Sequence, residues 1–189
     1  DGWFVYSGGR MTPFSPLNES GPVLAVFAGG GLYRYVMAPG ARVTGYVAIG
    51  EAMAGYQFAG ANHTIALFAG ARRVRHDLDS FDPGNPVQGE ETGAVLALDA
   101  WDKPVPHVLT TLAASASTAF GGYYARATAG RALPFFDKLP GGANPHGGGE
   151  AVVMGNENYR QWRFGGQLTG LALGPAEFGL SAGWYGGDD

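Results

Sequence analysis

The sequence contains no cysteine, and charged residues are scarce for a chain of 189 residues. The absence of cysteine excludes disulfide bonds, thiolate zinc sites and cysteine nucleophiles. Charged side chains make up 15% of the residues, against roughly 25% in a typical soluble domain. The formal net charge is −4, which argues against nucleic acid as a partner because nucleic-acid binding requires a basic surface.

Long apolar runs are also missing. No stretch of about 18 apolar residues occurs, so no helix is expected to span a membrane. This absence does not exclude a membrane β-barrel, because the strands of such a barrel need only about 9–11 residues each. The first residues, Asp1-Gly2-Trp3, lack the basic region of a secretory signal peptide, and we therefore expect a mature or trimmed chain without one.

Glycine is in excess, with 33 among 189 residues, whereas an average protein has roughly 7%. No Gly-X-Y period is present, which excludes collagen. Hydrophobic residues make up 46% of the chain, which argues against disorder. Glycines interrupt nearly every apolar segment, and each of them disfavours a helix. Even the best helix candidate, 46–58, contains Gly50 and Gly55. The glycine distribution therefore favours an all-β chain.

Apolar and polar residues alternate with a period of two, as they do along β-strands. In 177–185, Phe, Leu, Ala and Trp occupy every second position, and the preceding Gly174-Pro175 predicts a hairpin turn. Because the composition is uniform, we predict a single domain over 1–189, an up-and-down antiparallel β-barrel of about ten strands. The predicted strands are 3–14, 21–36, 42–59, 62–76, 90–103, 107–119, 121–133, 150–156, 160–173 and 175–186, with long connections at 77–89 and 134–149.

The two faces of these strands differ in a way that is typical of outer-membrane barrels. We expect one face, which includes Trp162, Leu168, Phe178 and Leu180, to meet lipid. The other face carries mostly small side chains and few charges, and its isolated arginines and acids suit an enclosed interior. In a soluble sandwich this face would be rich in Lys and Glu, yet the chain has only two lysines. Aromatic residues gather near strand ends, as they do in interfacial girdles.

Charged and polar side chains on the enclosed face form the main candidate site. We expect the acids of this set to pair with its arginines, because an unpaired charge in a narrow interior is costly. Such a network either fills the barrel and sets its register or forms a polar track for a sugar or an ion, and we favour the structural role. The set consists of the acids Glu51, Asp99 and Glu177, the arginines Arg34, Arg126 and Arg163, and Gln167.

Several pieces of the sequence resemble a known family. The most specific are 82–89 (DPGNPVQG) and 155–161 (GNENYRQ), and 50–58, 117–120 and 124–127 add weaker support. These pieces, in the same order along the chain, resemble sequence motifs of the cellulose biosynthesis protein BcsS family. The resemblance implies a bacterial outer-membrane β-barrel with an accessory, non-catalytic role in making or exporting cellulose.

Two segments depart from the family pattern. Segment 140–149 is glycine-rich and is interpreted as a variable loop. The chain ends in Gly186-Gly187-Asp188-Asp189, without the terminal aromatic residue that is common in outer-membrane barrels, which leaves open whether a last strand is missing.

The expected partners are outer-membrane lipid and cellulose or other components of cellulose secretion, with no nucleic acid. Contact with a sugar would use exposed aromatic rings and the long loops, because a sugar ring stacks on the face of Trp or Tyr. The candidate contact residues are Asp82, Asn85, Gln88, Trp101 and Tyr124. No cofactor and no metal are expected.

A barrel enzyme that modifies lipid A or acyl chains is an alternative function, since such enzymes use Ser, His and an acid. His107 shares a face with Ser115 and Ser117, but eight residues of strand separate His107 from Ser115, roughly 25 Å. His63 has no evident acid partner. We therefore expect no catalysis. A soluble lipocalin-like barrel, with the apolar side chains inside and an apolar ligand, is a further alternative.

Charged residues also cluster where the predicted fourth strand ends. The acids of 77–82 are candidates for a hard-cation site, but Gly84 is misplaced for a calcium loop and a solvated loop is favoured. The arginines of 72–75 bind lipopolysaccharide phosphates in one interpretation and pair with Asp77 and Asp79 in the other.

Overall fold

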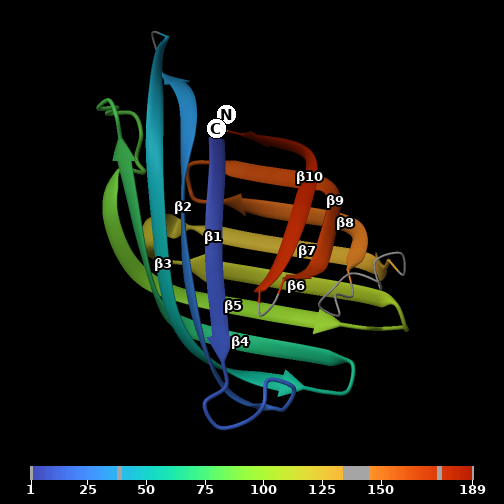
Figure 1. Cartoon of the computed structure of the whole chain (residues 1–189). Helices are drawn as coiled ribbons and strands as arrows, with labels where there is room; N and C mark the ends of the chain where they lie inside the picture. Colours follow the sequence, from blue (N-terminus) through green and yellow to red (C-terminus); the bar gives the residue numbers. More distant parts are fainter. Residues whose placement is uncertain (1, 38–39, 134–144, 174–175, 189) are drawn as a thin grey trace. The chain divides into compact units, whose positions relative to one another are not determined.

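The computed structural model describes residues 2–37, 40–133, 145–173 and 176–188, and they form an all-β chain (Figure 1). Ten strands follow one another in one sheet in the order of the chain, so that each strand is hydrogen-bonded to the next. The prediction of an all-β, up-and-down antiparallel fold with about ten strands is confirmed. The strands are β1 (Gly2–Met11), β2 (Gly21–Met37), β3 (Ala41–Ala59), β4 (His63–Leu78), β5 (Gly89–Asp102), β6 (Val108–Ser117), β7 (Tyr123–Ala132), β8 (His146–Gly155), β9 (Arg160–Leu173) and β10 (Ala176–Asp188), with a short 3-10 turn, η1 (Ala119–Gly121), between β6 and β7.

The chain divides into two compact units. The first unit comprises Asp1–Gln57, Leu67–Ala97 and Ala116–Gly122. The second unit comprises Phe58–Ala66, Leu98–Ser115 and Tyr123–Asp189. Within the described ranges, no helix has the length and the apolar character needed to cross a membrane.

The predicted strand boundaries agree with the structure to within a few residues, except at the start of β8. We expected this strand to begin at 150, but it begins at His146, and the loop predicted at 140–149 is therefore wrong over its last residues. Gly147, Gly148 and Gly149 pair with residues of β9 in an unbroken antiparallel register. Glycine has a low strand propensity, but pairing on both sides outweighs it here. The predicted turn at 174–175 and the first part of the 140–149 segment lie outside the described residues.

In the first unit, the two faces of the strands differ sharply in burial. Along β3, Val43 and Gln57 are fully buried, whereas Tyr46 and Tyr56 on the opposite face are exposed. This contrast arises because successive side chains of a strand point to opposite faces. We call the side that forms the core the buried face and the other side the exposed face. The apolar core of the first unit includes Val23, Val43, Phe68, Val74 and Val95.

The second unit shows the same division, but its buried face is more polar. Val152 of β8 is buried there together with polar side chains of neighbouring strands. The aromatic and aliphatic side chains alternate onto the exposed face as predicted, with exposed fractions of 43% for Trp162 and 66% for Leu180. Phe178 is exposed as well, and Leu168 is half-buried. Large apolar side chains thus cover the surface of this unit, and polar ones fill its interior.

We predict that Val23→Ala lowers the free energy of unfolding by about 2 kcal/mol, because it removes two buried methyl groups and leaves a cavity. Val23 has an exposed fraction of 0%, whereas Val26, on the other face of the same strand, has one of 61%. Val26→Ala is therefore the matched control, with an expected loss below about 0.5 kcal/mol. Denaturant unfolding followed by circular dichroism measures both, and equal losses would contradict the assignment of the faces.

Candidate functional site

A buried ion pair lies on the buried face of the first unit. Arg72 of β4 places its Nε and Nη2 atoms each 2.7 Å from Oε1 of Glu51 on β3. Both side chains are almost entirely buried. A carboxylate in such surroundings requires a cation, because removal from water is costly. Glu51 was expected to pair with an arginine of the predicted set, but its partner is Arg72, which we had placed in the basic cluster.

A second charge cluster lies in the second unit and is centred on the buried Glu150 of β8, whereas the side chains of Arg126 and Arg163 are 25% and 37% exposed. The side chain of Glu150 is 1% exposed. Its Oε2 accepts a hydrogen bond from Nε of Arg126 on β7, and its Oε1 accepts one from Nη2 of Arg163 on β9. The same Nη2 lies 3.3 Å from Oγ of Ser181 on β10. Two arginines thus share one carboxylate, which leaves the cluster with a net positive charge.

Glycine on β9 allows the strands beside this cluster to approach closely. Gly165 is the register partner of both Glu150 and Gly183. A Cβ atom at Gly165 would lie 2.1 Å from the carbonyl oxygen of Ala182, so a side chain does not fit there. The absence of side chains at Gly165 and Gly183 leaves space beside the Glu150 carboxylate on the buried face.

The remaining members of the predicted charge network have different surroundings. Arg34 lies on the exposed face of β2, opposite to the face of Tyr33 and Tyr35, and Asp99 of β5 is exposed. Gln167 is buried, and its Oε1 has no hydrogen-bond partner within the described part of the chain. Glu177 is the register partner of Ala172, but its side chain lies outside the described residues. The structure therefore brings together Arg126 and Arg163 from the predicted set, through Glu150, which the sequence analysis missed.

The long connection between β4 and β5 is folded onto the end of β2. The hydroxyl of Tyr35 donates to Oδ2 of Asp82 over 2.8 Å and accepts a hydrogen bond from Nδ2 of Asn85 over 3.0 Å. Nε2 of Gln88 donates to the carbonyl oxygens of Asp82 and Asn85. Asp82 is buried, and its Oδ1 also accepts the N–H of Gly84. Three of the predicted sugar-contact residues, Asp82, Asn85 and Gln88, thus form one network around a tyrosine.

Asp79, at the start of the same connection, is hydrogen-bonded to β3. Its Oδ1 accepts the backbone N–H of Thr44 over 2.9 Å, and its own N–H donates to the Thr44 carbonyl oxygen over 3.0 Å. The Thr44 N–H stabilises the charged carboxylate and thereby lowers the pKa of Asp79 below its usual value. The connection is therefore held at its start by Thr44 and in its middle by Tyr35.

A family model described as "Cellulose biosynthesis protein BcsS" matches residues 1–188 of the chain. The chain belongs to the cellulose biosynthesis protein BcsS family. The resemblance noted at 82–89 and 155–161 is thereby confirmed, and the match is longer than the part that carried it. The comparisons with curated proteins and with solved structures gave no match.

The two most specific pieces of this BcsS family member form tightly bonded connections. Residues 82–89 make the network around Tyr35. Residues 156–159 form the turn between β8 and β9, in which Oδ1 of Asn156 accepts the N–H groups of Asn158 and Tyr159. Asparagine suits this position because its side chain caps the backbone two residues further on. In both pieces, side-chain oxygens, those of Asp82, Asn85 and Asn156, accept backbone N–H groups of the connection.

Trp101 and Tyr124, the other two predicted contact residues, are half-buried and lie in the second unit. The ammonium group of Lys103 lies 5.8 Å from the ring centre of Trp101, within the range of a cation–π interaction. Contact of these two residues with a polysaccharide stays a prediction.

The arginines of 72–75 have separate partners. Arg75 pairs with Asp77 over 2.8 Å, as one of the two interpretations predicted, whereas Arg73 pairs with Glu90 over 2.7 Å. These two pairs are exposed and contribute little to stability. Within the described part of the chain, no group of three or more metal-binding side chains comes together.

The residues weighed for hydrolase chemistry have separate surroundings. His63 and His107 are exposed, and His107 has a positive φ of 72° in the connection before β6. Ser117 is buried, and its Oγ accepts the N–H of Ala119 over 3.1 Å at the start of η1. That hydroxyl therefore serves the backbone of a turn.

We predict that Glu150→Gln lowers the free energy of unfolding by about 1–3 kcal/mol, because Arg126 and Arg163 lose their shared buried carboxylate while both guanidinium groups keep partial contact with solvent. Glu157→Gln is the matched control, because Glu157 is exposed in the turn after β8, and its effect should stay within about 0.5 kcal/mol. Equilibrium unfolding of both variants in the same detergent checks this. A Glu150→Gln variant as stable as the control would show that the cluster carries no stability.

Proposed function

We propose that this BcsS family member is an outer-membrane β-barrel that serves cellulose biosynthesis or export as a non-catalytic accessory. The family match supports the link to cellulose. The observation that carries the membrane location is the exposure of large apolar side chains beside buried, paired charges. Trp184 has an exposed fraction of 81%, whereas the Glu150 side chain is 1% exposed. Soluble proteins bury apolar side chains of this size and expose their charges.

The exposed face of β3 has the pattern of a lipid-facing strand. Between Tyr46 and Tyr56, every outward position is Ala or Gly, and all of these positions are exposed. Ten residues of strand span roughly 33 Å, or about 25 Å along the membrane normal at a typical tilt. This length matches the apolar band of outer-membrane barrels, and the two tyrosines stand where the aromatic girdles would lie. On β4, Leu67, Ala69 and Ala71 precede Arg73 and Arg75 on the same face, which supports a band that ends before the arginines.

A sheet within lipid must have no unpaired edge. β1 and β10 are the terminal strands of the sheet order. Backbone N–H and C=O groups that are left unpaired in hydrocarbon cost several kcal/mol each, so only a closed barrel is stable there. We therefore include barrel closure in the proposal.

The interior favours a supporting role over conduction and catalysis. The buried acids Glu51 and Glu150 are already paired with arginines, which is the arrangement expected of charges that fill an interior. A barrel of ten strands is little wider than the eight-stranded barrels that side chains fill completely. A hydrated glucan chain would not pass through it. We propose that the contribution to cellulose production is made by the surface and the connections.

The membrane location predicts a large effect of a charge placed in the apolar band. Ala52→Arg, midway between Tyr46 and Tyr56 on the exposed face, should cost about 2–4 kcal/mol of folding free energy in bilayers. Val36→Arg is the matched control, since Val36 is exposed on the same face of the neighbouring strand β2 and pairs with Arg42, beyond this band, with an expected cost of about 0–1 kcal/mol. Refolding into lipid vesicles with urea titration measures both. A soluble protein that tolerates both changes equally would refute the membrane location.

Deletion of the gene tests the cellulose role separately. We expect less cellulose, or disordered fibres, while synthase activity in isolated inner membranes is unchanged. The cellulose dye-binding of colonies and electron microscopy of the fibres give the readout, and complementation with the wild-type gene is the control. Normal cellulose amount and fibre structure in the deletion strain would contradict the proposed role.

A further inference from the structure

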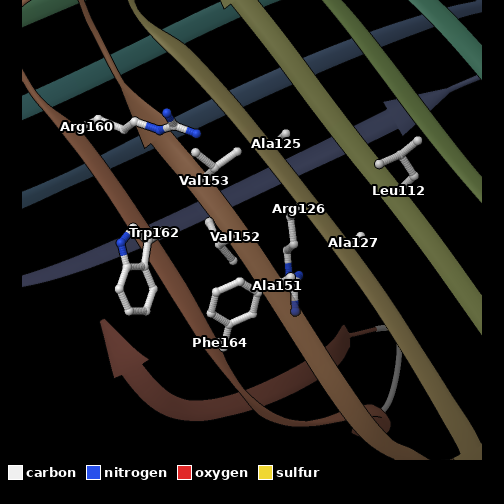
Figure 2. A pocket seen from close by; sticks show the side chains of 10 residues that line it. All are labelled: Leu112, Ala125, Arg126, Ala127, Ala151, Val152, Val153, Arg160, Trp162 and Phe164. Atoms are coloured by element: carbon white, nitrogen blue, oxygen red, sulfur yellow. The ribbon is translucent and has the colours of Figure 1, made fainter. Parts of the chain in front are cut away.

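A groove of about 460 Å³ lies on the exposed face of the second unit. Figure 2 shows small side chains, among them Ala125 and Ala127, in its middle, with Leu112 on one side and Trp162 and Phe164 on the other. The groove is open on its outer side, which suits a chain laid along the surface rather than an enclosed small molecule. The groove is large enough for part of a lipid molecule.

The strand register explains why the groove forms there. Ala125 of β7 is paired with Val153 of β8, and Val153 is paired in turn with Trp162 of β9. In the next row on the same face, Ala127 is paired with Ala151, and Ala151 with Phe164. Each row thus runs from a small residue to a large aromatic one. Between these rows lies the groove, which is bounded by the aromatic rings on β9 and by Leu112 on β6.

A cation lies at one end of this apolar groove. Arg160 precedes Trp162 by two residues, so both side chains belong to the exposed face of β9. Arg160 also lines the groove, and Figure 2 shows its guanidinium group directed over the groove towards Val153. An apolar groove with a guanidinium at its end fits an anionic amphiphile. The groove suits the apolar part of such a molecule, and arginine binds phosphate through a fork of N–H donors.

We propose that this groove binds an acyl chain of an anionic glycerophospholipid and that Arg160 holds the phosphate of the same molecule. The proposal rests on the membrane location proposed above. Trp162 next to Arg160 supports it, because indole rings prefer the boundary between headgroups and acyl chains.

The position of Arg160 along the strand favours a phospholipid over lipopolysaccharide. At the end of the sheet where Arg160 follows the turn 156–159, three connections have five residues or fewer and 79–88 has ten, whereas the longest connection, 133–145, joins the opposite ends of β7 and β8. In outer-membrane barrels the short turns face the periplasm and the long loops face outward. The guanidinium would therefore lie in the inner leaflet, which consists of phospholipids, and lipopolysaccharide occupies the other leaflet.

The test is a titration of the full chain, purified in a non-ionic detergent, with palmitoyl-oleoyl-phosphatidylglycerol, followed by native mass spectrometry. Arg160→Gln should weaken the apparent Kd about tenfold, which is the loss expected for one charge-assisted phosphate contact. Arg131→Gln is the matched control, because Arg131 is an exposed arginine near the other end of β7 and does not line the groove.

A second pair of variants tests the groove itself. Ala127→Leu fills it and should reduce phosphatidylglycerol binding at least tenfold, whereas Ala129→Leu, at the next exposed position of β7 and outside the groove, should not. Equal binding by the wild type, Arg160→Gln and Ala127→Leu would overturn the proposal, and so would preferential binding of lipopolysaccharide at Arg160. Because the titration is done in detergent, its failure is distinguishable from failure of the membrane location, which the vesicle refolding of Ala52→Arg tests.

Discussion

The interaction on which the second unit depends is the sharing of one buried carboxylate by two arginines. Glu150 lies on a strand between the strands of Arg126 and Arg163, so its two oxygens reach a guanidinium on each side. The cluster thereby ties β7, β8 and β9 together at one level of the sheet. Shifting any of these strands by one residue would move its charge to the exposed face, so the cluster also specifies the register. The Glu51–Arg72 pair acts in the same way between β3 and β4.

This use of the interior explains the composition of the exposed face. In the second unit, an interior filled by paired charges, glycines and small polar side chains has little room for tryptophan or leucine, and these residues lie on the other side of each strand. In water such an arrangement would be unstable, because it exposes the surface that folding normally removes from solvent. In hydrocarbon the balance is reversed, which is why the face pattern and the proposed location support each other.

The strands could be predicted from the sequence, but most of the site could not. The period of two appears in most strands, and interrupting glycines argued against a helix at 46–58, so β3 was predicted nearly to the residue. The charge partners depend on which strands are neighbours and on their register, neither of which the pattern of one strand contains. Glu150 was missed because the three glycines before it suggested a loop, and Arg72 was grouped with Arg73 although alternation places them on opposite faces. That alternation was the signal that would have found Arg72.

The connection between β4 and β5 differs from an ordinary loop in one respect. The side chains that hold it, those of Asp79, Asp82 and Asn85, also satisfy the ends of β2 and β3. Releasing the connection would leave the Tyr35 hydroxyl and a buried carboxylate without partners, so the loop and the strand ends melt as one cooperative unit. Surface loops usually tolerate insertions and sequence drift. This connection should tolerate neither insertions nor substitutions of these side chains, so its length should be constrained by the strands that it joins.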